Sequence, residues 1–454
     1  MNCGGGGRAR TPSPNHGYHR HMTATLTAHR GEILHFLDDP GAPGRDAADA
    51  WRYFPDGALV VEDGIVAACG DAAETLAKFP AARVAEHRDC LLVPGLVDAH
   101  IHFPQVDIIA AYGTQLLDWL QRHTYPAEAR FAEPAHAAAL AEVFLDELLR
   151  NGTTTALVFG SVHPQSVDAL FAAAHARNLR LLAGKTMMDR NAPDAVRDTA
   201  ESSYQDSTEL LAKWHRKGRL GYAVTPRFAP TSSERQLQLA GRLLAENPGV
   251  HLQTHIAENA RECAWVAELF PHCRDYLDVY DRHGLLGRRA VLAHGIHLNA
   301  REWARLAEAD ANLAFCPTSN LFMGSGLFDL RCADEHHARV GLGSDVGGGD
   351  SFSLLRVINE AYKVEQLQGR NLPPLRALYL ATLGGARALD LQNVIGNFAP
   401  GKEADFIALN YRATPLIARR LAGCRGLEEK LFALLMLGDD RAVSGVWVMG
   451  ERWE

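Results

Sequence analysis

The sequence predicts an α/β fold, a (β/α)8 TIM-type barrel with a small composite β-sandwich domain built from both chain ends. Short apolar runs typical of buried strands alternate with helical segments, such as 135–150 and 233–247. Strand–turn–strand patterns precede and follow this region. A doubly wound sheet is the alternative, but no Gly-x-Gly-x-x-Gly follows the first strand. The predicted barrel strands are 96–102, 153–161, 179–188, 220–228, 250–258, 290–298, 311–320 and 339–347.

The chain divides into four predicted regions. Its first residues are rich in Gly, Pro and Arg without an apolar core, so we expect a disordered extension, with Met22 as an alternative start. The segments ALVVEDGIVAACG, PGKEADFIALN and AVSGVWVMGERW predict two half-sheets that meet, because the termini of a compact unit tend to lie close together. The regions are the N-terminal extension 1–22, the first part of the small domain 23–92, the barrel 93–395 and the second part of the small domain 396–454.

Composition excludes several classes of function. The 454 residues are 47% apolar and 22% charged, as in ordinary globular proteins. The net charge of −8 argues against a nucleic-acid or anionic-membrane partner. No uncharged apolar run reaches the roughly 18 residues of a membrane span. The eight cysteines are scattered without a Cys-x-x-Cys, which indicates reduced thiols and a cytoplasmic protein.

A candidate metal-binding pair lies in the stretch LLVPGLVDAHIHFPQ. Residues 91–93 are predicted to start a buried strand, which continues after a Pro-Gly pair. Side chains alternate between the faces of a strand, so Asp98, His100 and His102 share one face, where two imidazoles can bind a metal ion. The pair alone is a weak signal, because among 21 histidines about one His-x-His is expected by chance, and residues 19–21 form another.

Polar side chains stand at the ends of further predicted strands. The carboxyl ends of barrel strands meet at one face, and this is where such barrels place their chemistry. Several histidines and an aspartate at one level are hard to attribute to chance. The residues are Gln105 after the first strand, Arg227 and Phe228 on the fourth, His255 and Glu258 on the fifth, His294 on the sixth and Asp345 on the eighth.

The motifs PGLVDAHIH, THIAE, LAHGIHL and GSDVGGG, in this order, resemble the amidohydrolase superfamily. Within it, the guanine deaminases are similar in HIHFPQ, DWLQRHTYPAEARF, MMDRNAPD, TPRFAPT, CPTSNLFMGSGLFDL and GSDVGGGDSFS. The resemblance covers nearly all of 25–454. It implies hydrolysis of guanine to xanthine and ammonia, one Zn²⁺ per subunit and a homodimer. The implied zinc ligands are His100, His102, His255 and Asp345.

Three catalytic residues follow from this resemblance, Glu258, Asp345 and His294. Asp345 would accept a proton from a water whose pKa the zinc lowers to about 7. Glu258 would protonate the ring nitrogen beside the attacked carbon and later help ammonia leave. His294 would stabilise the developing charge. The alternatives are a surface glutamate that opens the next helix and a structural core histidine.

Substrate recognition is predicted to depend on donors and acceptors of defined type. Arg227 offers only donors, so it should face the purine oxygen or a ring nitrogen, whereas Gln105 can donate and accept at once. Phe228 either stacks on the ring or packs in the core. The predicted substrate-binding residues are Gln105, Arg227, Phe228, His255, Glu258, His294 and Asp345.

Three other residues keep two interpretations each. Trp119 caps the pocket or packs in the core, and Asp98 orients a metal ligand from behind or is structural. Lys185 lies on the third strand, whereas binuclear relatives carry a bridging carboxylated lysine on the fourth; a hydrogen-bond network is its alternative role. One metal ion is therefore expected.

Other functions compete with guanine deamination. A relative on the same scaffold could deaminate or dechlorinate 8-oxoguanine, a pterin or a triazine, but Arg227, Gln105 and the long CPTSNLFMGSGLFDL motif favour guanine. A non-catalytic scaffold would have lost metal ligands, and all are present. The small zinc deaminases need a Pro-Cys-x-x-Cys that the chain lacks. Ligand type alone does not separate zinc from iron.

Overall fold

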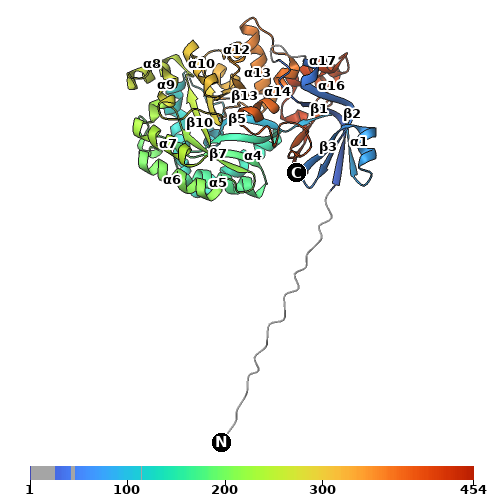
Figure 1. The fold of residues 1–454 in the computed structure, drawn as a ribbon, viewed down its shortest axis with the longest axis horizontal. Coiled ribbons are helices and arrows are strands. Elements are labelled where there is room, and N and C mark those ends of the chain that lie inside the picture. The colour runs from blue at the N-terminus through green and yellow to red at the C-terminus, as the bar shows by residue number, and fades with distance from the viewer. Residues whose placement is uncertain (2–25, 42–46, 114) are drawn as a thin grey trace.

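The computed structural model describes Met1 and residues 26–41, 47–113 and 115–454. The predicted disordered extension, apart from Met1, and the alternative start Met22 lie outside the described residues. A barrel ringed by helices lies beside a separate small sheet that contains strands from both ends of the described chain (Figure 1). The predicted fold class is confirmed.

All eight predicted barrel strands are present, each parallel to its bonded neighbours. Parallel strands are buried on both faces, which explains their continuous apolar sequences. In β6 and β7, Leu157 and Leu182 belong to a cluster inside the barrel, and their neighbours Ala156 and Leu181 belong to the larger core beneath the helices. The strands are β5 (Leu96–His102), β6 (Thr153–Phe159), β7 (Arg180–Gly184), β9 (Leu220–Pro226), β10 (His251–Ile256), β11 (Ala290–His294), β12 (Asn312–Phe315) and β13 (Arg339–Leu342), with the short β8 (Thr186–Met187) paired to β9.

Helices cover the outside of the barrel, and the two segments predicted as helices correspond to α4 and α7. Polar side chains begin several of them: Thr199, Ser233 and Asn259 accept hydrogen bonds from backbone N–H groups of the first turn. The helices are α4 (Pro134–Arg150), α5 (Pro164–Ala176), α6 (Ala200–Trp214), α7 (Glu234–Glu246), α8 (Ala260–Leu269), α9 (Tyr276–Asp281), α10 (Ala300–Glu308), α11 (Pro317–Phe322), α12 (Leu330–Glu335), α13 (Leu354–Leu367), α14 (Pro374–Leu380) and α15 (Leu383–Ala388), with α2 (Leu116–Trp119) and α3 (Tyr125–Ala129) above the barrel mouth.

The barrel closes between its first strand and the segment that follows its last. The Asp345 N–H donates to the His100 carbonyl and the His102 N–H donates to the Val346 carbonyl, both at 2.9 Å. The Asp98 carboxylate accepts from the backbone N–H groups of His100 (3.1 Å) and Ser344 (3.0 Å). This buried carboxylate therefore joins the two edges of the seam. Asp98 therefore orients the segment that carries His100 through a backbone N–H group.

The small sheet contains seven strands among the described residues, and one prediction about it was wrong. Residues 91–93 do not begin the barrel strand; they end β4, which pairs antiparallel with β14. Gly95 separates β4 from the barrel strand β5. A larger residue would not fit there, because a Cβ would lie 2.1 Å from Thr154 Oγ1. The strands, in sheet order, are β16 (Glu451–Trp453), β15 (Val443–Val448), β14 (Phe406–Asn410), β4 (Arg83–Pro94), β1 (Leu26–Phe36), β2 (Trp51–Glu62) and β3 (Ile65–Asp71), with α1 (Ala72–Lys78) beside β2 and β3.

The last part of the chain also contacts the barrel. Its helices α16 (Pro415–Leu421) and α17 (Leu427–Leu437) lie within the region predicted as the second part of the small domain. However, α17 packs against α13 and α14. The predicted domain limits at 92 and 395 stay predictions.

An ion-pair cluster joins the small sheet to the bottom of the barrel. The Glu403 carboxylate accepts from Arg180 Nε at 2.7 Å and from Arg219 Nη2 at 2.7 Å, and Arg219 also pairs with Asp405. Burial opposes ionisation of Glu403, but the hydrogen bonds and charges of the two arginines lower its pKa. Asp405 in turn accepts from the Met449 N–H at 2.8 Å. These charges hold the N-terminal ends of β7 and β9 in the barrel against β14 and against the turn before β16.

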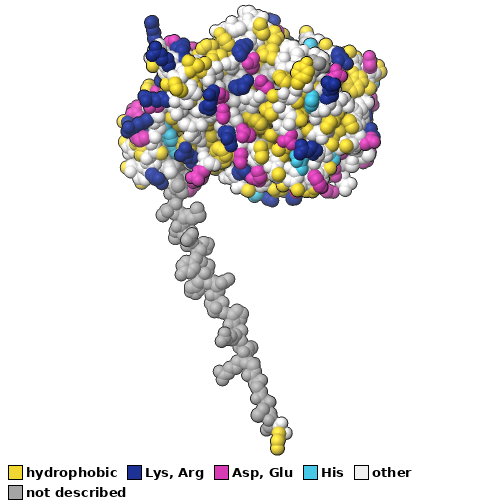
Figure 2. Space-filling model, turned by 180° about the vertical axis from the view of Figure 1, so that it is seen from behind, with side chains coloured by type: hydrophobic (Ala, Val, Ile, Leu, Met, Phe, Trp, Pro, Cys, Tyr) yellow, Lys and Arg dark blue, Asp and Glu magenta, His cyan; other side chains and the backbone are white. Residues whose placement is uncertain are grey.

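On the face seen in Figure 2, basic and acidic side chains are interspersed. Among the described residues, no helix has the length and apolar character needed to cross a membrane.

We expect Glu403→Ala to lower the free energy of unfolding by about 3–5 kcal/mol, because it leaves Arg180 without its carboxylate partner and Arg219 with Asp405 alone. Glu246→Ala is the control, since Glu246 pairs with Arg242 one helical turn away on an exposed face; that loss should be far smaller, because exposed ion pairs contribute little. Thermal and denaturant unfolding measure both. Equal losses in the two variants would show that the cluster does not join the two parts.

Candidate metal and substrate site

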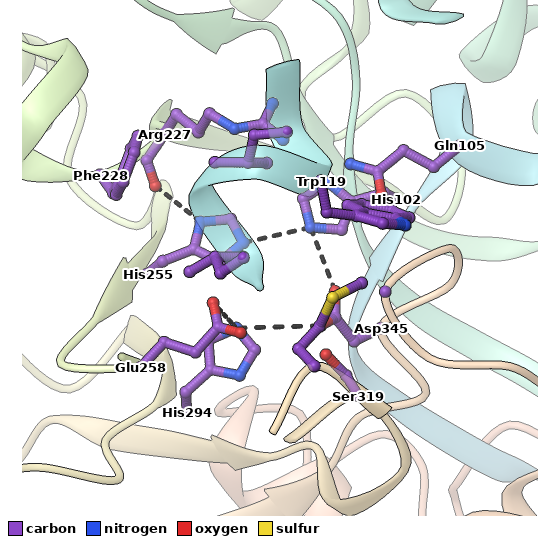
Figure 3. Close-up of a pocket in the computed structure, with 14 residues that line it drawn as sticks. His102, Gln105, Trp119, Arg227, Phe228, His255, Glu258, His294, Ser319 and Asp345 are labelled. Carbon is purple, nitrogen blue, oxygen red and sulfur yellow. Dashed lines mark hydrogen bonds and ion pairs between the residues drawn. The ribbon is translucent and has the colours of Figure 1, made fainter. Parts of the chain in front are cut away.

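Four side chains with metal-binding atoms converge at the mouth of the barrel. They come from both sides of the seam and from β10, and all are buried. Figure 3 shows three of them, His102, His255 and Asp345. One ligand atom from each lies within 4.8 Å of the others. The four are His100, His102, His255 and Asp345, which are the predicted metal ligands.

The spacing of these atoms fits one divalent cation. His102 Nε2 lies 3.1 Å from His255 Nε2, and Asp345 Oδ1 lies 3.2 Å from His100 Nε2 and 3.3 Å from His102 Nε2. Tetrahedral ligands at about 2.0–2.2 Å from a zinc ion are themselves about 3.3 Å apart. The buried His100 Nε2 has no hydrogen-bond partner among the described residues, as expected for a metal-binding nitrogen.

Hydrogen bonds and burial set the protonation of the ligands. His255 Nδ1 lies 2.7 Å from the Arg227 carbonyl, which can only accept, so Nδ1 carries the proton and Nε2 keeps its lone pair. Burial and the neighbouring histidines hold the pKa of His255 well below its usual value, and burial lowers the pKa of His102 to about 3. Neutral imidazole is the form that binds metal ions.

His294 is oriented differently from the three ligand histidines. The Asn320 side-chain amide donates to His294 Nδ1 at 2.9 Å. Burial lowers the pKa of His294 to about 3, so the ring is neutral and its single proton sits on Nε2. Nε2 lies 3.4 Å from Glu258 Oε2 and 3.8 Å from Asp345 Oδ2. His294 therefore lines the pocket and offers a donor to it, and its Nδ1 partner is a side chain, not the backbone.

Glu258 is 4% exposed and faces the pocket, so the alternative of a surface glutamate is wrong. Its backbone N–H donates to Glu262, the residue that completes the capping box of α8. Ser325 Oγ donates to Glu258 Oε1 at 3.1 Å. Sequence reasoning missed Asn320 and Ser325, although both lie in the CPTSNLFMGSGLFDL motif; polar residues in that apolar stretch were the available signal.

The two carboxyl groups of the pocket have opposite tendencies. Burial and the charges of Asp345 and Glu262 raise the pKa of Glu258 well above its usual value. Burial opposes the ionisation of Asp345, but His100, His102 and His294 hold its pKa well below the usual value. One group therefore tends to hold a proton at neutral pH and the other to be ionised, a division typical of acid–base catalysis.

Arg227 and Gln105 lie on the side of the pocket opposite Glu258 and His294 (Figure 3). Both contact Glu128, a residue that sequence reasoning missed. The side chain of Glu128 is fully buried, and its signal was a lone carboxylate in the apolar part of DWLQRHTYPAEARF. Phe228 and Trp119 both line the pocket, and both also pack in an apolar cluster with Leu116. Each of these two aromatic residues therefore both lines the pocket and packs in the apolar cluster.

A family model described as "Amidohydrolase family" matches residues 91–452. The chain belongs to the amidohydrolase family. It is 50% identical to the guanine deaminase of Escherichia coli (strain K12) over 94% of this chain and 97% of that protein. It is 44% identical to a probable guanine deaminase of Deinococcus radiodurans over 94% and 98% of the two chains. The resemblance to guanine deaminases is confirmed.

Solved structures agree with this assignment. The E. coli guanine deaminase structure superposes with a TM-score of 0.92 over 94% of this chain and 99% of that one, at 50% identity. A guanine deaminase from C. acetobutylicum with bound guanine in the active site superposes with a TM-score of 0.86 over 94% and 100%, at 27% identity.

Among the described residues that line the pocket of this amidohydrolase there is no lysine. Lys185 is fully buried, pairs with Asp198 and lies near Asp206, so its alternative role in a hydrogen-bond network is confirmed. The reason for expecting a single metal ion, which is the lack of a bridging lysine, therefore still applies to the described residues.

We expect His100→Ala or Asp345→Ala to lower bound metal to a small fraction of the wild-type content, since each removes one of four ligands. His251→Ala is the matched control: His251 is also buried, but it lies at the other end of β10, where Nε2 contacts the Leu389 carbonyl. Elemental analysis and circular dichroism measure metal and fold. Full metal content in the folded ligand variants would contradict the site.

Proposed function

We propose that the chain catalyses the hydrolytic deamination of guanine to xanthine and ammonia. The decisive observation is a donor pair, Arg227 and Gln105, that faces a buried His₃Asp group across a pocket containing Glu258. Similarity to guanine deaminases over nearly the whole chain supports the same substrate and favours it over 8-oxoguanine, pterins and triazines. All four metal-binding residues are present and converge, which argues against a non-catalytic scaffold.

The cofactor proposed for the site is one Zn²⁺ held by His100, His102, His255 and Asp345. Imidazole nitrogens and a carboxylate oxygen suit zinc, and iron accepts the same set. Bound there, the cation supplies Lewis acidity, which lowers the pKa of water to about 7. The homodimer that the resemblance implies and the cytoplasmic location that the scattered cysteines indicate stay predictions, which light scattering and cell fractionation test.

The residues of the chain divide the proton transfers between them. Asp345, held ionised by its histidine neighbours, accepts the proton of the attacking water. Glu258, which burial keeps protonated, delivers its proton to the ring nitrogen beside C2, then takes up the second proton of the attacking water and passes it to the departing amino group. The proton accepted by Asp345 finally returns to Glu258. A C–O bond forms and the C–N bond breaks, so guanine and water become xanthine and ammonia. The N–H of His294 stabilises the negative charge that develops between these steps.

Arg227 and Gln105 orient the purine. The donors of Arg227 match the oxygen and ring nitrogens of guanine, and Gln105 offers both a donor and an acceptor. Adenine carries an amino group where guanine carries the oxygen, which leaves buried donors unpaired. Ammonia release from a panel of purines, with metal analysis of the same sample, tests the proposed activity.

We expect Glu258→Gln to keep its metal and bind guanine while kcat falls by about 10²–10⁴-fold, because an amide cannot deliver a proton. The Ser325 hydrogen bond survives in this variant, which limits structural change. Steady-state kinetics and binding of guanine measure the two effects. A loss below tenfold would make Glu258 a bystander.

We expect Arg227→Leu to raise KM and lower kcat for guanine with metal content unchanged, and Arg227→Lys to be a poor substitute because a point charge lacks the two-donor edge. Wild type should prefer guanine over adenine by about 10⁴–10⁵-fold. The comparison is kcat/KM for the three proteins. Agreement within about threefold, well under the roughly 1.4 kcal/mol of a tenfold change, would show that Arg227 does not recognise the substrate.

A further inference from the structure

The carboxylate of Glu128 is the shared partner of both side chains proposed to recognise the purine. Arg227 Nη1 donates to both of its oxygens, at 2.8 and 2.9 Å, and Gln105 Nε2 donates to one of them at 3.1 Å. The side chains of Glu128 and Arg227 are 0% and 3% exposed. Glu128 does not line the pocket, so it acts from behind the two residues that do.

The geometry leaves the recognition groups of Arg227 available. Its guanidinium meets the carboxylate through a single nitrogen, and among the described residues Nε and Nη2 have no hydrogen-bond partner. The Nε–Nη2 edge, which presents two parallel N–H donors, is therefore not used by Glu128. The contact through Nη1 keeps that edge free at the pocket wall.

The same carboxylate determines which way the Gln105 amide is turned. A carboxylate only accepts, so the amide nitrogen must point to Glu128, and the amide oxygen accepts from the Gly347 N–H at 3.3 Å. Glu128 and the Gly347 N–H together assign the donor end and the acceptor end of Gln105.

Charge balance gives Glu128 a second effect. Burial disfavours the charged form of Arg227, and Glu128 offsets this and holds the pKa of the guanidinium above its usual value. Arg227 lines the same pocket as His102 and His255. An uncompensated guanidinium there would move away from a bound cation and from its position on the pocket wall.

A local irregularity brings Glu128 to this position. Five residues of π-helix, Leu120–Thr124, separate α2 from α3, and Pro126 lies in the first turn of α3, which carries Glu128. Such wide turns occur often at functional sites. Tyr125, beside this turn, places its ring 5.8 Å from the Arg227 guanidinium.

We propose that Glu128 is a positioning residue for substrate recognition, whose carboxylate holds Arg227 and Gln105 in the orientation that matches the oxygen and adjacent N–H of guanine. The inference rests on the proposed function. Glu128 touches no reacting atom, so its loss should affect the recognition of that edge of the purine and not the proton transfers.

The test compares guanine with 2-aminopurine, which keeps the reacting amino group and lacks both the oxygen and the adjacent N–H. In Glu128→Gln we expect kcat/KM for guanine to fall by about tenfold to a hundredfold, mainly through KM, because buried donors lose their acceptor. The inhibition constant of 2-aminopurine should change less than about threefold, and metal content should stay the same. The added loss on combining Glu128→Gln with Arg227→Leu should be small, since both remove one recognition unit.

Glu403→Gln is the matched control, because Glu403 also pairs with arginines but lies at the opposite end of the barrel. It should change neither kcat/KM for guanine relative to the inhibition constant of 2-aminopurine nor the preference between the two purines. If Glu128→Gln fails to fold, Glu128→Asp keeps the charge with a shorter reach. This variant should lower kcat/KM for guanine and leave the inhibition constant of 2-aminopurine unchanged.

The outcomes separate the two proposals. Equal weakening of guanine and 2-aminopurine, or none, in a folded Glu128 variant overturns the positioning role while guanine deamination stands. A wild-type protein that releases no ammonia from guanine overturns both.

Discussion

The seam that closes the barrel is the constraint on which the site depends. The metal-binding residues of β5 and Asp345 come from opposite ends of the barrel sequence, and two backbone hydrogen bonds bring them side by side. The buried carboxylate of Asp98 ties the two edges together through His100 and Ser344. Buried carboxylates need several donors to be stable, so the same bonds that satisfy Asp98 also determine where the ligands stand.

Around this seam, neighbours that are not themselves reactive assign a state to each reactive group. The Arg227 carbonyl leaves a lone pair on His255, whereas Asn320 leaves a proton on His294. Burial favours the protonated form of Glu258, and the histidines favour the ionised form of Asp345. In the proposed function these two histidines and two carboxyl groups act as ligand, donor, acid and base, because the contacts around each of them differ.

Several features were predictable because they depend on local pattern. Alternation along one strand placed His100 and His102 on a common face, and the order of strands placed His255, His294 and Asp345 at the same end of the barrel. Segment 91–93, which was wrongly predicted to start the barrel strand, shows what a local pattern cannot decide, because an apolar run suits a strand of either sheet. The separation of the two strands at Gly95 depends on Thr154, some sixty residues away. Glu128, Asn320 and Ser325 were missed because their partners are distant in sequence, 99, 26 and 67 residues apart.

The sequence by itself determined the fold class, the family resemblance and the residue types that can bind a metal ion and exchange protons with a purine. Periodicity and motif order suffice for these, because strands and helices form from local side-chain patterns. Tertiary structure decided which nitrogen of each histidine is free, which carboxyl group holds a proton and which way Arg227 and Gln105 face. These properties arise from burial and from hydrogen bonds between distant segments, and neither exists until the barrel closes.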